Sequence, residues 1–269
     1  MLKASDANLT VEVVLVNTIG DQRRDVPIHE LGGTGVFVKE VQQAVLHGDA
    51  DIAVHSAKDL PSVTSDGLVL ACVPERADVR DAMIGKPLRD IPHGGVVATG
   101  SVRRRAQLRG VRPDLMFSEL RGNIDTRLDN AARFDAIVLA CAGIDRIGRS
   151  AAIVERLELD IMIPQIGQGA LAIECRADDG PTCQQLAAID NAEHHQCVDA
   201  ERAFLASIGG GCDAPVGAYA RISGAVNELV AVVAGLDGAL HRSLQHGTDT
   251  NALGQAVARE LLVFLGPER

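Results

Sequence analysis

Short apolar runs rich in valine and isoleucine alternate with amphipathic segments through the first two thirds of the chain. Runs of this length and composition are typical of buried strands. They predict strands over residues 11–16, 51–55, 68–73, 95–99, 115–120, 135–140 and 171–174. Between these runs apolar residues recur at helical spacing, as at Phe37, Val41 and Val45. The alternation of strands and helices favours a mostly parallel sheet with helices on both faces.

The last third of the chain has a different pattern. Residues 191–206 have helical periodicity and lead into a run of glycines. Three consecutive strands are then predicted over residues 216–222, 228–236 and 240–246. Asp237-Gly238 suits a hairpin turn between the last two strands. A closing helix is predicted over residues 251–265, where an apolar residue recurs every fourth position. Consecutive strands followed by a helix indicate a small α+β domain.

The composition is that of a globular protein. The chain has 269 residues, of which 46% are apolar and 23% charged, so disorder is excluded and two or three domains are expected. Charged stretches at residues 74–85 and 176–182 mark the seams between domains. The apolar runs are far shorter than the ~20 residues that cross a bilayer. The first ten residues lack the apolar core of a signal peptide. We therefore expect a soluble, cytoplasmic protein.

The charge is distributed unevenly. A net charge of −10 argues against binding to nucleic acid or to an anionic membrane. Residues 101–150 nevertheless contain ten arginines, no lysine and six acidic residues, which indicates a local pocket for a small anion. The six cysteines are scattered without a CxxC pair, so we expect reduced thiols and no metal site.

Residues 98–105 read ATGSVRRR and carry the strongest local signal. A predicted strand ends, glycine turns the chain, and Ser101 stands where a helix N-cap belongs. Cations are unfavourable in the first turn of a helix, because the positive end of the helix dipole lies there. Arg103 and Arg104 at this place favour an anion bound at the helix N-terminus. The alternative is a solvated basic helix start.

Further arginines follow two other predicted strand ends, each beside a glycine. They are Arg121 and Arg127 after the strand over 115–120, and Arg146 after the strand over 135–140. Together with residues 103–105 they indicate one polyanionic ligand at the carboxyl edge of the sheet. Arginine suits this role because its guanidinium binds carboxylates and phosphates in a bidentate manner. For Arg127 alone, a plain surface charge is an equally good interpretation.

Residues 55–62 read HSAKDLPS and end another predicted strand in a Lys-Asp pair. Asp59 could protonate a leaving group or stabilise a cation there. An ordinary turn before a proline explains Lys58 and Asp59 equally well. The glycines at 32–35 could present backbone N–H groups to an anion, although they lack the Gly-Lys-Ser/Thr end of a P-loop. Residues 167–169 read GQG, which suits a hinge between domains.

Cys212 lies in a loop, after three glycines and close before a proline. Such a thiol is expected to be accessible. The adjacent Asp213 would raise its pKa, so a fast thiolate nucleophile is not indicated. Covalent attachment of a cofactor needs only accessibility. The other cysteines are interpreted as small buried apolar residues.

Six segments in order resemble the porphobilinogen deaminase (hydroxymethylbilane synthase) family. They are HSAKDLPS, TGSVRRRAQL, LRGNIDTRL, CAGIDRIG, PQIGQGALAIECR and ERAFLASIGGGCDAPVGAYA. The resemblance covers nearly the whole chain from about Leu9. It implies an α/β fold with two periplasmic-binding-protein-like (type II) domains and a small C-terminal α+β domain. The expected domains are residues 1–74 with 170–188, residues 75–169, and residues 189–269.

The resemblance also implies an activity. Four porphobilinogen molecules would be deaminated and joined head to tail into hydroxymethylbilane, with release of ammonia. The growing chain would be held on a dipyrromethane cofactor, linked by a thioether to the cysteine that matches Cys212. A monomer is expected, with porphobilinogen as its partner.

The resemblance assigns residues to roles. Asp59 matches the catalytic aspartate that assists loss of ammonia, and Lys58 matches its basic neighbour. The residues implied to hold the cofactor are Cys212, Ser101, Arg103, Arg104, Arg121, Lys58 and Asp59. Those implied to bind the substrate are Arg121, Arg127, Arg146 and Gln168.

Two departures from the family pattern leave alternatives open. The family opens with a strand and a helix that bear an Arg-x-Ser-x-Leu-Ala segment, whereas this chain starts after it. Thr34 stands where the family often has lysine in the glycine loop. An N-terminally truncated deaminase with weak or no activity is therefore one alternative. A noncatalytic anion-binding protein of periplasmic-binding-protein architecture is another.

Overall fold

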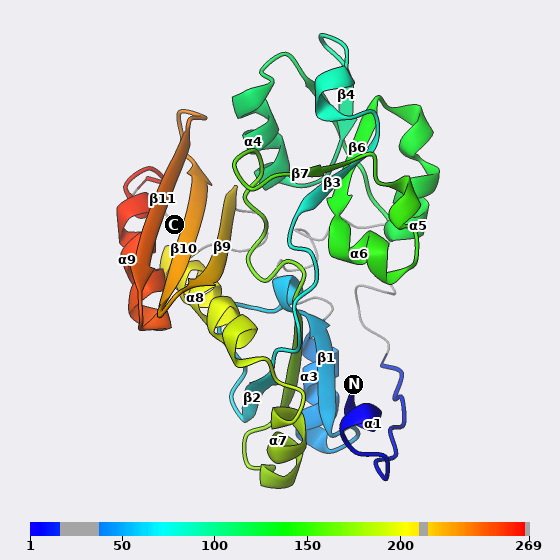
Figure 1. Cartoon of the computed structure of the whole chain (residues 1–269), viewed down its shortest axis with the longest axis vertical. Coiled ribbons are helices and arrows are strands. Elements are labelled where there is room, and N and C mark those ends of the chain that lie inside the picture. Colours follow the sequence, from blue (N-terminus) through cyan, green and yellow to red (C-terminus); the bar gives the residue numbers. More distant parts are fainter. Residues whose placement is uncertain (17–37, 210–214, 267–269) are drawn as a thin grey trace.

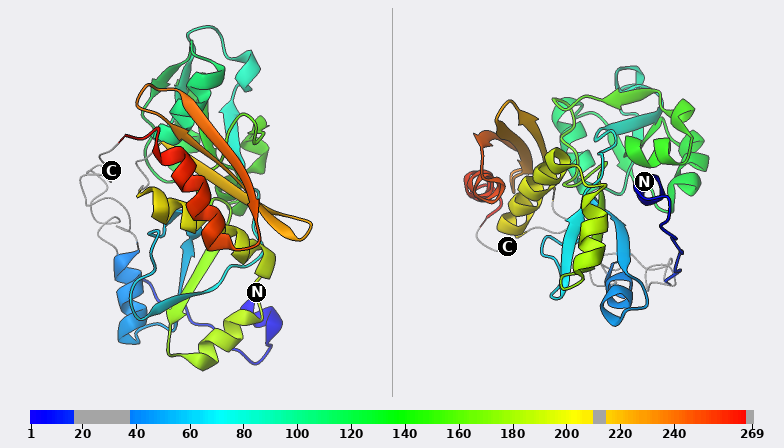
Figure 2. Two further views of the ribbon diagram at one scale, coloured as in Figure 1. Left: turned by 90° about the vertical axis from the view of Figure 1, so that its left-hand side faces the viewer. Right: turned by 60° about the horizontal axis from the view of Figure 1, so that its bottom comes forward.

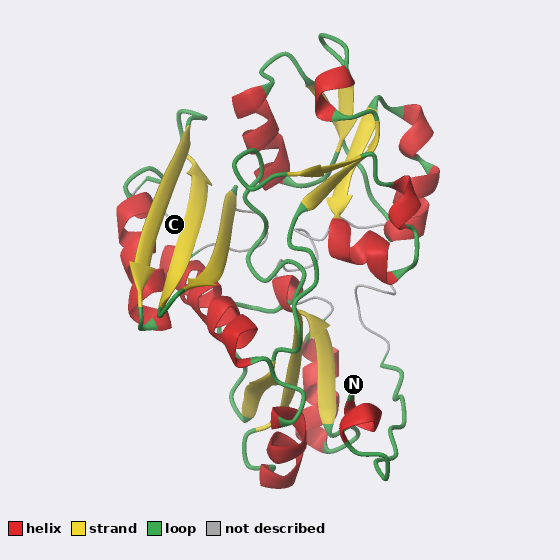
Figure 3. Cartoon of the chain, in the orientation of Figure 1, coloured by secondary structure: helices red, strands yellow, loops and turns green. Residues whose placement is uncertain are grey.

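The computed structural model describes residues 1–16, 38–209 and 215–266 of the chain. Three units are arranged around a central set of loops, each built on its own sheet (Figures 1 and 3). The glycine loop at residues 32–35 and Cys212 lie outside the described residues. None of the helices in the described part is long and apolar enough to cross a membrane.

The first unit contains a three-stranded sheet in the order β1-β8-β2. Its strands are β1 (Ile52–Ser56), β2 (Leu68–Cys72) and β8 (Leu171–Arg176). Both neighbours of β8 run antiparallel to it. The helices of this unit are α1 (Leu2–Ser5), α3 (Lys39–His47) and α7 (Gly180–Ala187), and the short 3-10 turn η2 (Ala57–Asp59) follows β1.

The second unit is a five-stranded mixed sheet in the order β5-β4-β6-β3-β7. Its strands are β3 (Asp81–Gly85), β4 (Val96–Ala98), β5 (Met116–Ser118), β6 (Ala136–Ala140) and β7 (Glu155–Leu157). Its helices are α4 (Val102–Val111), α5 (Ile124–Asp129) and α6 (Cys141–Arg146), with 3-10 turns at Leu88–Asp90, Ala131–Arg133 and Ser150–Ala152. Successive residues of β6 pack into separate cores on the two faces, so helices cover the sheet on both sides.

The third unit is an antiparallel meander of β9 (Val216–Ser223), β10 (Val226–Ala234) and β11 (Leu240–Gly247). The helices α8 (Ala192–Ile208) and α9 (Thr250–Leu262) cover one face, as Figure 2 shows for α9. The predicted α+β unit, its hairpin after β10 and its closing helix are confirmed. Phe204, Leu229 and Val257 form the centre of the core between helices and sheet.

The expected α/β fold is confirmed, but the prediction of a mostly parallel sheet is wrong. Among the described strands, parallel pairing joins only β4 to β5 and β6. The strand β3 runs antiparallel to both of its neighbours. The apolar pattern cannot reveal this, because a strand buried on both faces has the same composition in either direction.

Several elements differ from the prediction. Residues 11–16 form no strand, and Val13 and Leu15 are 78% and 89% exposed. A β-branched run becomes a strand only where a neighbouring strand accepts its backbone hydrogen bonds. Conversely, the expected seam at residues 74–85 contains β3, whose Ala82 and Met83 are fully buried. The charged residues before β3 suggested a loop between domains. The last of them, Asp81, is the first residue of the strand and is itself buried. The short elements β7, α6 and α7 were also not predicted.

Gly254 sets the distance between α8 and α9, because a side chain there would collide with backbone. An added Cβ would lie 2.6 Å from the Phe204 nitrogen and 2.7 Å from the Ala200 oxygen. We therefore expect Gly254→Ala to destabilise the protein by ~1–3 kcal/mol through overpacking. The matched control is Gly180→Ala at the start of α7, where an added Cβ meets nothing within 4 Å. Urea unfolding of both variants is the measurement, and equal stability would contradict the close approach.

Candidate active site

The start of α4 is held by one buried carboxylate. Ser101 is the N-cap of α4, as predicted, and its hydroxyl accepts a hydrogen bond from the Arg104 nitrogen at 3.4 Å. Arg103 Nη2 lies 2.8 Å from Asp81 Oδ2, and Arg104 Nη2 lies 2.7 Å from Asp81 Oδ1. All three of these charged residues are buried. Asp81, the first residue of β3, thus supplies the anion that the basic first turn of α4 requires.

Both arginines also donate to backbone carbonyl groups of the second unit. Arg103 Nη1 lies 2.7 Å from the Ile163 oxygen, and Arg104 Nη1 lies 2.9 Å from the Val138 oxygen. Gln168, on the segment that returns to the first unit, donates to Asp81 Oδ1 at 3.0 Å. Arg103 Nε is buried and has no hydrogen-bond partner among the described residues. Two guanidiniums therefore share one carboxylate, and a donor remains for a further acceptor.

The electrostatics of this cluster favour an anion. Burial alone would raise the pKa of Asp81, but the guanidiniums of Arg103 and Arg104 outweigh burial and lower it to about 2. Burial lowers the pKa of Arg103 despite its ion pair. The carboxylate is thus firmly ionised, and the wall of the site carries an excess of positive charge.

Lys58 and Asp59 lie on η2, directly after the end of β1. Gly167 (φ 71°) packs closely against this turn. A side chain there would not fit, because an added Cβ would lie 2.9 Å from the Lys58 nitrogen. Burial lowers the pKa of Lys58, and the nearby Arg104 and Arg103 lower it further. The Asp59 side chain is partly exposed, but the surrounding protein displaces much of its water and so raises its pKa. The positive charges of Lys58 and Arg127 oppose this rise without cancelling it. The two pKa values thus move toward each other, which suits proton transfer.

Arg127 brings α5 into the same site. Asn123 caps α5 by accepting from the Thr126 nitrogen at 2.9 Å, and Arg127 Nε donates to the Gly122 oxygen at 2.7 Å. Burial and the charge of Arg104 lower the pKa of Arg127, while Asp59 raises it. Arg127 therefore lies close enough to Asp59 and Arg104 for their charges to interact, and its predicted role in the site stays a prediction.

Arg121 and Arg146, by contrast, are exposed. The Arg121 side chain is 58% exposed, and its Nε lies 4.0 Å from Glu119 Oε2. Arg146 is exposed at the end of α6. The roles predicted for these two residues stay predictions.

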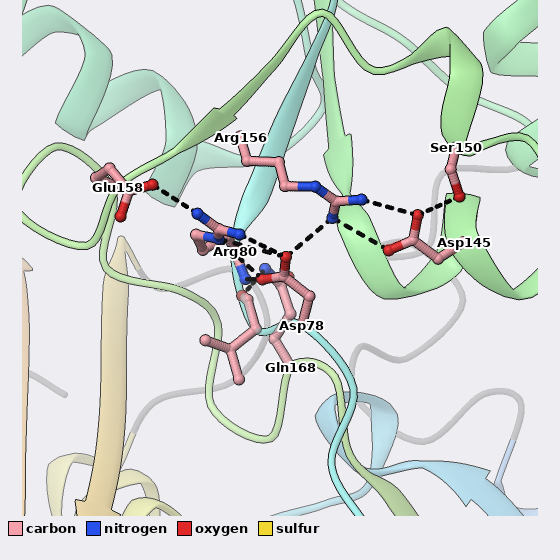
Figure 4. Close-up of polar contacts among 8 residues, drawn as sticks. Asp78, Arg80, Asp145, Ser150, Arg156, Glu158 and Gln168 are labelled. Atoms are coloured by element: carbon pink, nitrogen blue, oxygen red, sulfur yellow. Dashed lines mark hydrogen bonds and ion pairs between the residues drawn. The ribbon is translucent and has the colours of Figure 1, made fainter.

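A network of ion pairs holds α6 in place (Figure 4). Asp145 accepts from Arg156 at 3.1 Å and from Ser150 at 2.6 Å. Arg156 also donates to Asp78 at 2.9 Å. Asp78 lies on the segment that runs from the first unit into the second. Asp78 in turn binds Arg80 at 3.0 Å. The helix that carries Arg146 is thereby tied to the connection between the two units.

A cavity of about 30 Å³ lies between the units. Its polar lining includes Lys58, Ser101, Arg103 and Arg202. Its other lining residues are Ala57, Leu60, Gln165, Ile166, Leu205 and Val216. Leu205 on α8 and Val216 on β9 belong to the two elements that flank residues 210–214. The prediction for Cys212 falls in that undescribed segment and stays a prediction.

Sequence analysis missed two charged residues of the site. Arg202 on α8 is buried and donates to the Pro61 oxygen at 2.9 Å, so it joins the third unit to the loop after Asp59. Burial lowers its pKa. Asp81 is the other. The sequence contained one signal for Asp81, which is an acidic residue directly before an apolar run. For Arg202 the sequence contained no signal except its place on a predicted helix.

The site therefore brings together Lys58, Asp59, Ser101, Arg103, Arg104, Arg127 and Gln168. These residues come from two α/β units and from the segment that joins them, and their charges suit the binding of an anion. Comparison with known proteins identifies the class of protein. A family model described as porphobilinogen deaminase, dipyromethane cofactor binding domain, matches residues 1–184, and one described as porphobilinogen deaminase, C-terminal domain, matches residues 195–263. The chain belongs to the porphobilinogen deaminase family, and the predicted resemblance is confirmed.

Relatives named porphobilinogen deaminase align over nearly the whole chain. The protein of Roseiflexus castenholzii is 46% identical over 268 residues, covering 97% of this chain and 88% of the relative. That of Bacillus pumilus is 45% identical over 269 residues, covering 96% and 86%. Among solved structures, an arginine-specific periplasmic binding protein of Salmonella typhimurium aligns over 57% of this chain and 70% of its own, with 15% identity and a TM-score of 0.32. That score is too low to establish a common fold.

The buried carboxylate makes a prediction for stability. Asp81→Asn leaves two buried guanidiniums without their counter-charge, and we expect a loss of ~3–5 kcal/mol. The control is Glu119→Gln, because Glu119 is 54% exposed and pairs with Arg105 at the surface, where such pairs contribute ~1 kcal/mol or less. Urea unfolding measures both.

The same carboxylate predicts a pH dependence. The pKa of Asp81 is about 2 in the folded protein and about 4 when unfolded, so its contribution is complete above pH ~4. It is lost as the pH falls toward 2, at a cost of ~2 kcal/mol. The variant should lack this part of the acid sensitivity. Parallel pH profiles for the variant and the parent protein between pH 2 and 5 would contradict the assignment.

Proposed function

We propose that this chain deaminates four porphobilinogen molecules and joins them head to tail into hydroxymethylbilane, releasing ammonia at each step. The observation that carries the proposal is the Lys58–Asp59 pair facing a buried cluster of arginines, in a chain of the porphobilinogen deaminase family. Porphobilinogen has two carboxylates and one aminomethyl group. The arginines suit the carboxylates, and the Lys-Asp pair suits the departing amine.

The chemistry of the donors fits a dipyrromethane group. Its carboxylates require positive charge and hydrogen-bond donors, and Lys58, Ser101, Arg103 and Arg202 offer these around one cavity. Arg103 Nε is a buried donor without a partner among the described residues, which is what a further carboxylate would use. We propose that Arg103, Arg104 and Ser101 hold the group and that Cys212 forms the thioether. When bound, the group supplies the pyrrole position to which the first substrate molecule is joined.

Asp59 would move the proton at the reacting centre. Its raised pKa favours the protonated carboxyl group, which would deliver its proton to the amine nitrogen as ammonia leaves. The resulting carboxylate then faces the positive charge that develops on the substrate ring. Lys58, with its lowered pKa, lies beside Asp59 and can return a proton between steps.

The arginines would orient the substrate. Arg127 lies close enough to Asp59 and Arg104 for their charges to interact, so a carboxylate bound by Arg127 would place its ring next to the acid. Gln168 is engaged with Asp81 and with the Val79 oxygen at 2.8 Å, so its proposed part is to orient the arginine cluster. Arg121 and Arg146 are exposed and are proposed to bind carboxylates of further rings.

The finer assignments belong to the same proposal. The domain limits 1–74 with 170–188, 75–169 and 189–269 are supported by the chain leaving the first sheet after β2 and returning at β8. A monomer is part of the proposal. A cytoplasmic location is also part of the proposal.

The cofactor assignment predicts the mass of the protein. The purified full chain should exceed its sequence mass by one dipyrromethane, and Cys212→Ser should have the bare sequence mass. Cys197→Ser is the control, because Cys197 is a buried cysteine of α8 and should leave the added mass in place. A parent protein at its bare mass, with Cys212 open to alkylation, would refute a loaded enzyme.

The acid assignment predicts a loss of turnover. Asp59→Asn removes the transferable proton, and kcat for porphobilinogen consumption should fall by roughly 100-fold or more. The added mass on Cys212 should persist, which separates loss of chemistry from loss of the cofactor. Asp66→Asn, an exposed aspartate of the same unit, is the control and should keep normal kcat. Normal turnover of Asp59→Asn would remove Asp59 from the mechanism, and binding of porphobilinogen without turnover by the parent protein would favour a noncatalytic anion-binding protein.

A further inference from the structure

Two cysteines of the first unit lie in direct contact. Cys175 is near the end of β8, and Cys183 is in the first half of α7. Their Sγ atoms are 3.4 Å apart. A disulfide bond has an S–S distance of about 2 Å, so a shift of little more than 1 Å would join them. The site described above uses neither thiol.

The local structure holds the two sulfurs together. Arg176 Nη2 lies 2.7 Å from Asp179 Oδ2, immediately after β8. Asp179 is the N-cap of α7, and its backbone oxygen accepts from the Cys183 nitrogen at 3.0 Å. The tight connection between strand and helix thus fixes the first turn of α7 over the end of β8.

The two thiols differ in access. Cys175 is fully buried in an apolar cluster with Ile173 and Leu186, whereas Cys183 is only half-buried at its edge. Burial raises the pKa of Cys175 to about 12, so this thiol stays protonated. A reagent from solvent therefore reaches Cys183 first. The buried Cys175 is in contact with Cys183 and can react only with it.

We propose that Cys175 and Cys183 are an oxidisable thiol pair that forms a reversible disulfide with a peroxide. Cys183 attacks one peroxide oxygen, the O–O bond breaks, and the products are a sulfenic acid and water. The Cys175 sulfur then attacks the sulfenic sulfur, and its proton leaves with the hydroxyl group as a second water. Both thiols are oxidised and one hydrogen peroxide is reduced to two waters. A dithiol reductant reverses the bond by thiol–disulfide exchange.

The pair lies away from the proposed active site. Cys175 stands opposite Ile52 in the antiparallel ladder, whereas Lys58 and Asp59 follow Ser56 at the other end of β1. The strand length between Ile52 and Ser56 is about 14 Å, at roughly 3.4 Å per residue. Figure 1 shows α7 at the end of the first unit that is remote from α4 and α6. The bond would thus pin α7 to β8 without entering the active site.

Peptide mapping tests the pair directly. The folded full chain is treated with hydrogen peroxide, the peroxide is removed, remaining thiols are blocked with N-ethylmaleimide in denaturant, and the protein is digested with trypsin without reduction. Cleavage after Arg156, Arg176 and Arg202 should give one cross-linked species of residues 157–176 and 177–202. Cys197 also lies in the second peptide, so fragmentation between positions 183 and 197 assigns the bond. Dithiothreitol before blocking should restore both thiols.

Three variants sharpen the test. Cys183→Ser should give no cross-link. Cys175→Ser should accumulate a sulfenic acid on Cys183 that dimedone traps, which the parent protein should not. Cys72→Ser should still form the bond, because Cys72 lies in the same cluster but opposite Ile173 in the ladder. Separately blocked Cys175 and Cys183 in the oxidised folded protein would overturn the proposal. All readouts are independent of Cys212, so they stand even if the proposed deaminase activity fails.

Discussion

The ion pairs of Asp81 are the constraint on which the site depends. A carboxylate with no exposed surface is stable only if its charge is compensated, and here two guanidiniums of α4 and an amide of the returning segment do so. The same contacts orient α4 against β3 and fix Gln168 next to both. Because two cations share one anion, the wall of the site retains positive charge. The stabilising interaction and the affinity for anions therefore have one origin.

A second buried carboxylate, that of Glu201 on α8, connects the third unit to the other two. It pairs at 2.7 Å with Arg76, which lies on the segment that leaves the first unit. It also accepts from the Gly167 nitrogen at 2.7 Å and from the Ala220 nitrogen at 2.8 Å. One side chain thus ties both connecting segments to α8 and β9. The elements that flank Cys212 are therefore fixed relative to the segments that position Asp59 and Gln168.

The sequence predicted what depends on local pattern. Runs of valine and isoleucine located β1, β6 and the strands of the third unit, and the Gly-Ser turn located the start of α4. The sequence did not predict β3, because a strand that starts with a charged residue looks exposed. The charge of Asp81 is compensated by Arg103 and Arg104, which lie about twenty residues further along the chain. The sequence wrongly made residues 11–16 a strand, because pairing depends on a neighbour that the pattern does not contain. The chemistry of the site followed from residue types, whereas Asp81 and Arg202 needed three-dimensional proximity.

The arginines also divide by what already holds them, and this division bears on the proposed reaction. Arg103 and Arg104 are buried and bonded to Asp81, so they are preorganised and lose little entropy when a carboxylate binds. Such residues suit a group that stays bound throughout. Arg121 and Arg146 are exposed, so in the proposed reaction they would exchange one carboxylate for another at low cost. A product that gains two carboxylates with each ring needs both kinds. Lys58 and Asp59 of η2 lie close to the buried arginines. In the proposed reaction this would keep the acid at the one place where each new bond forms.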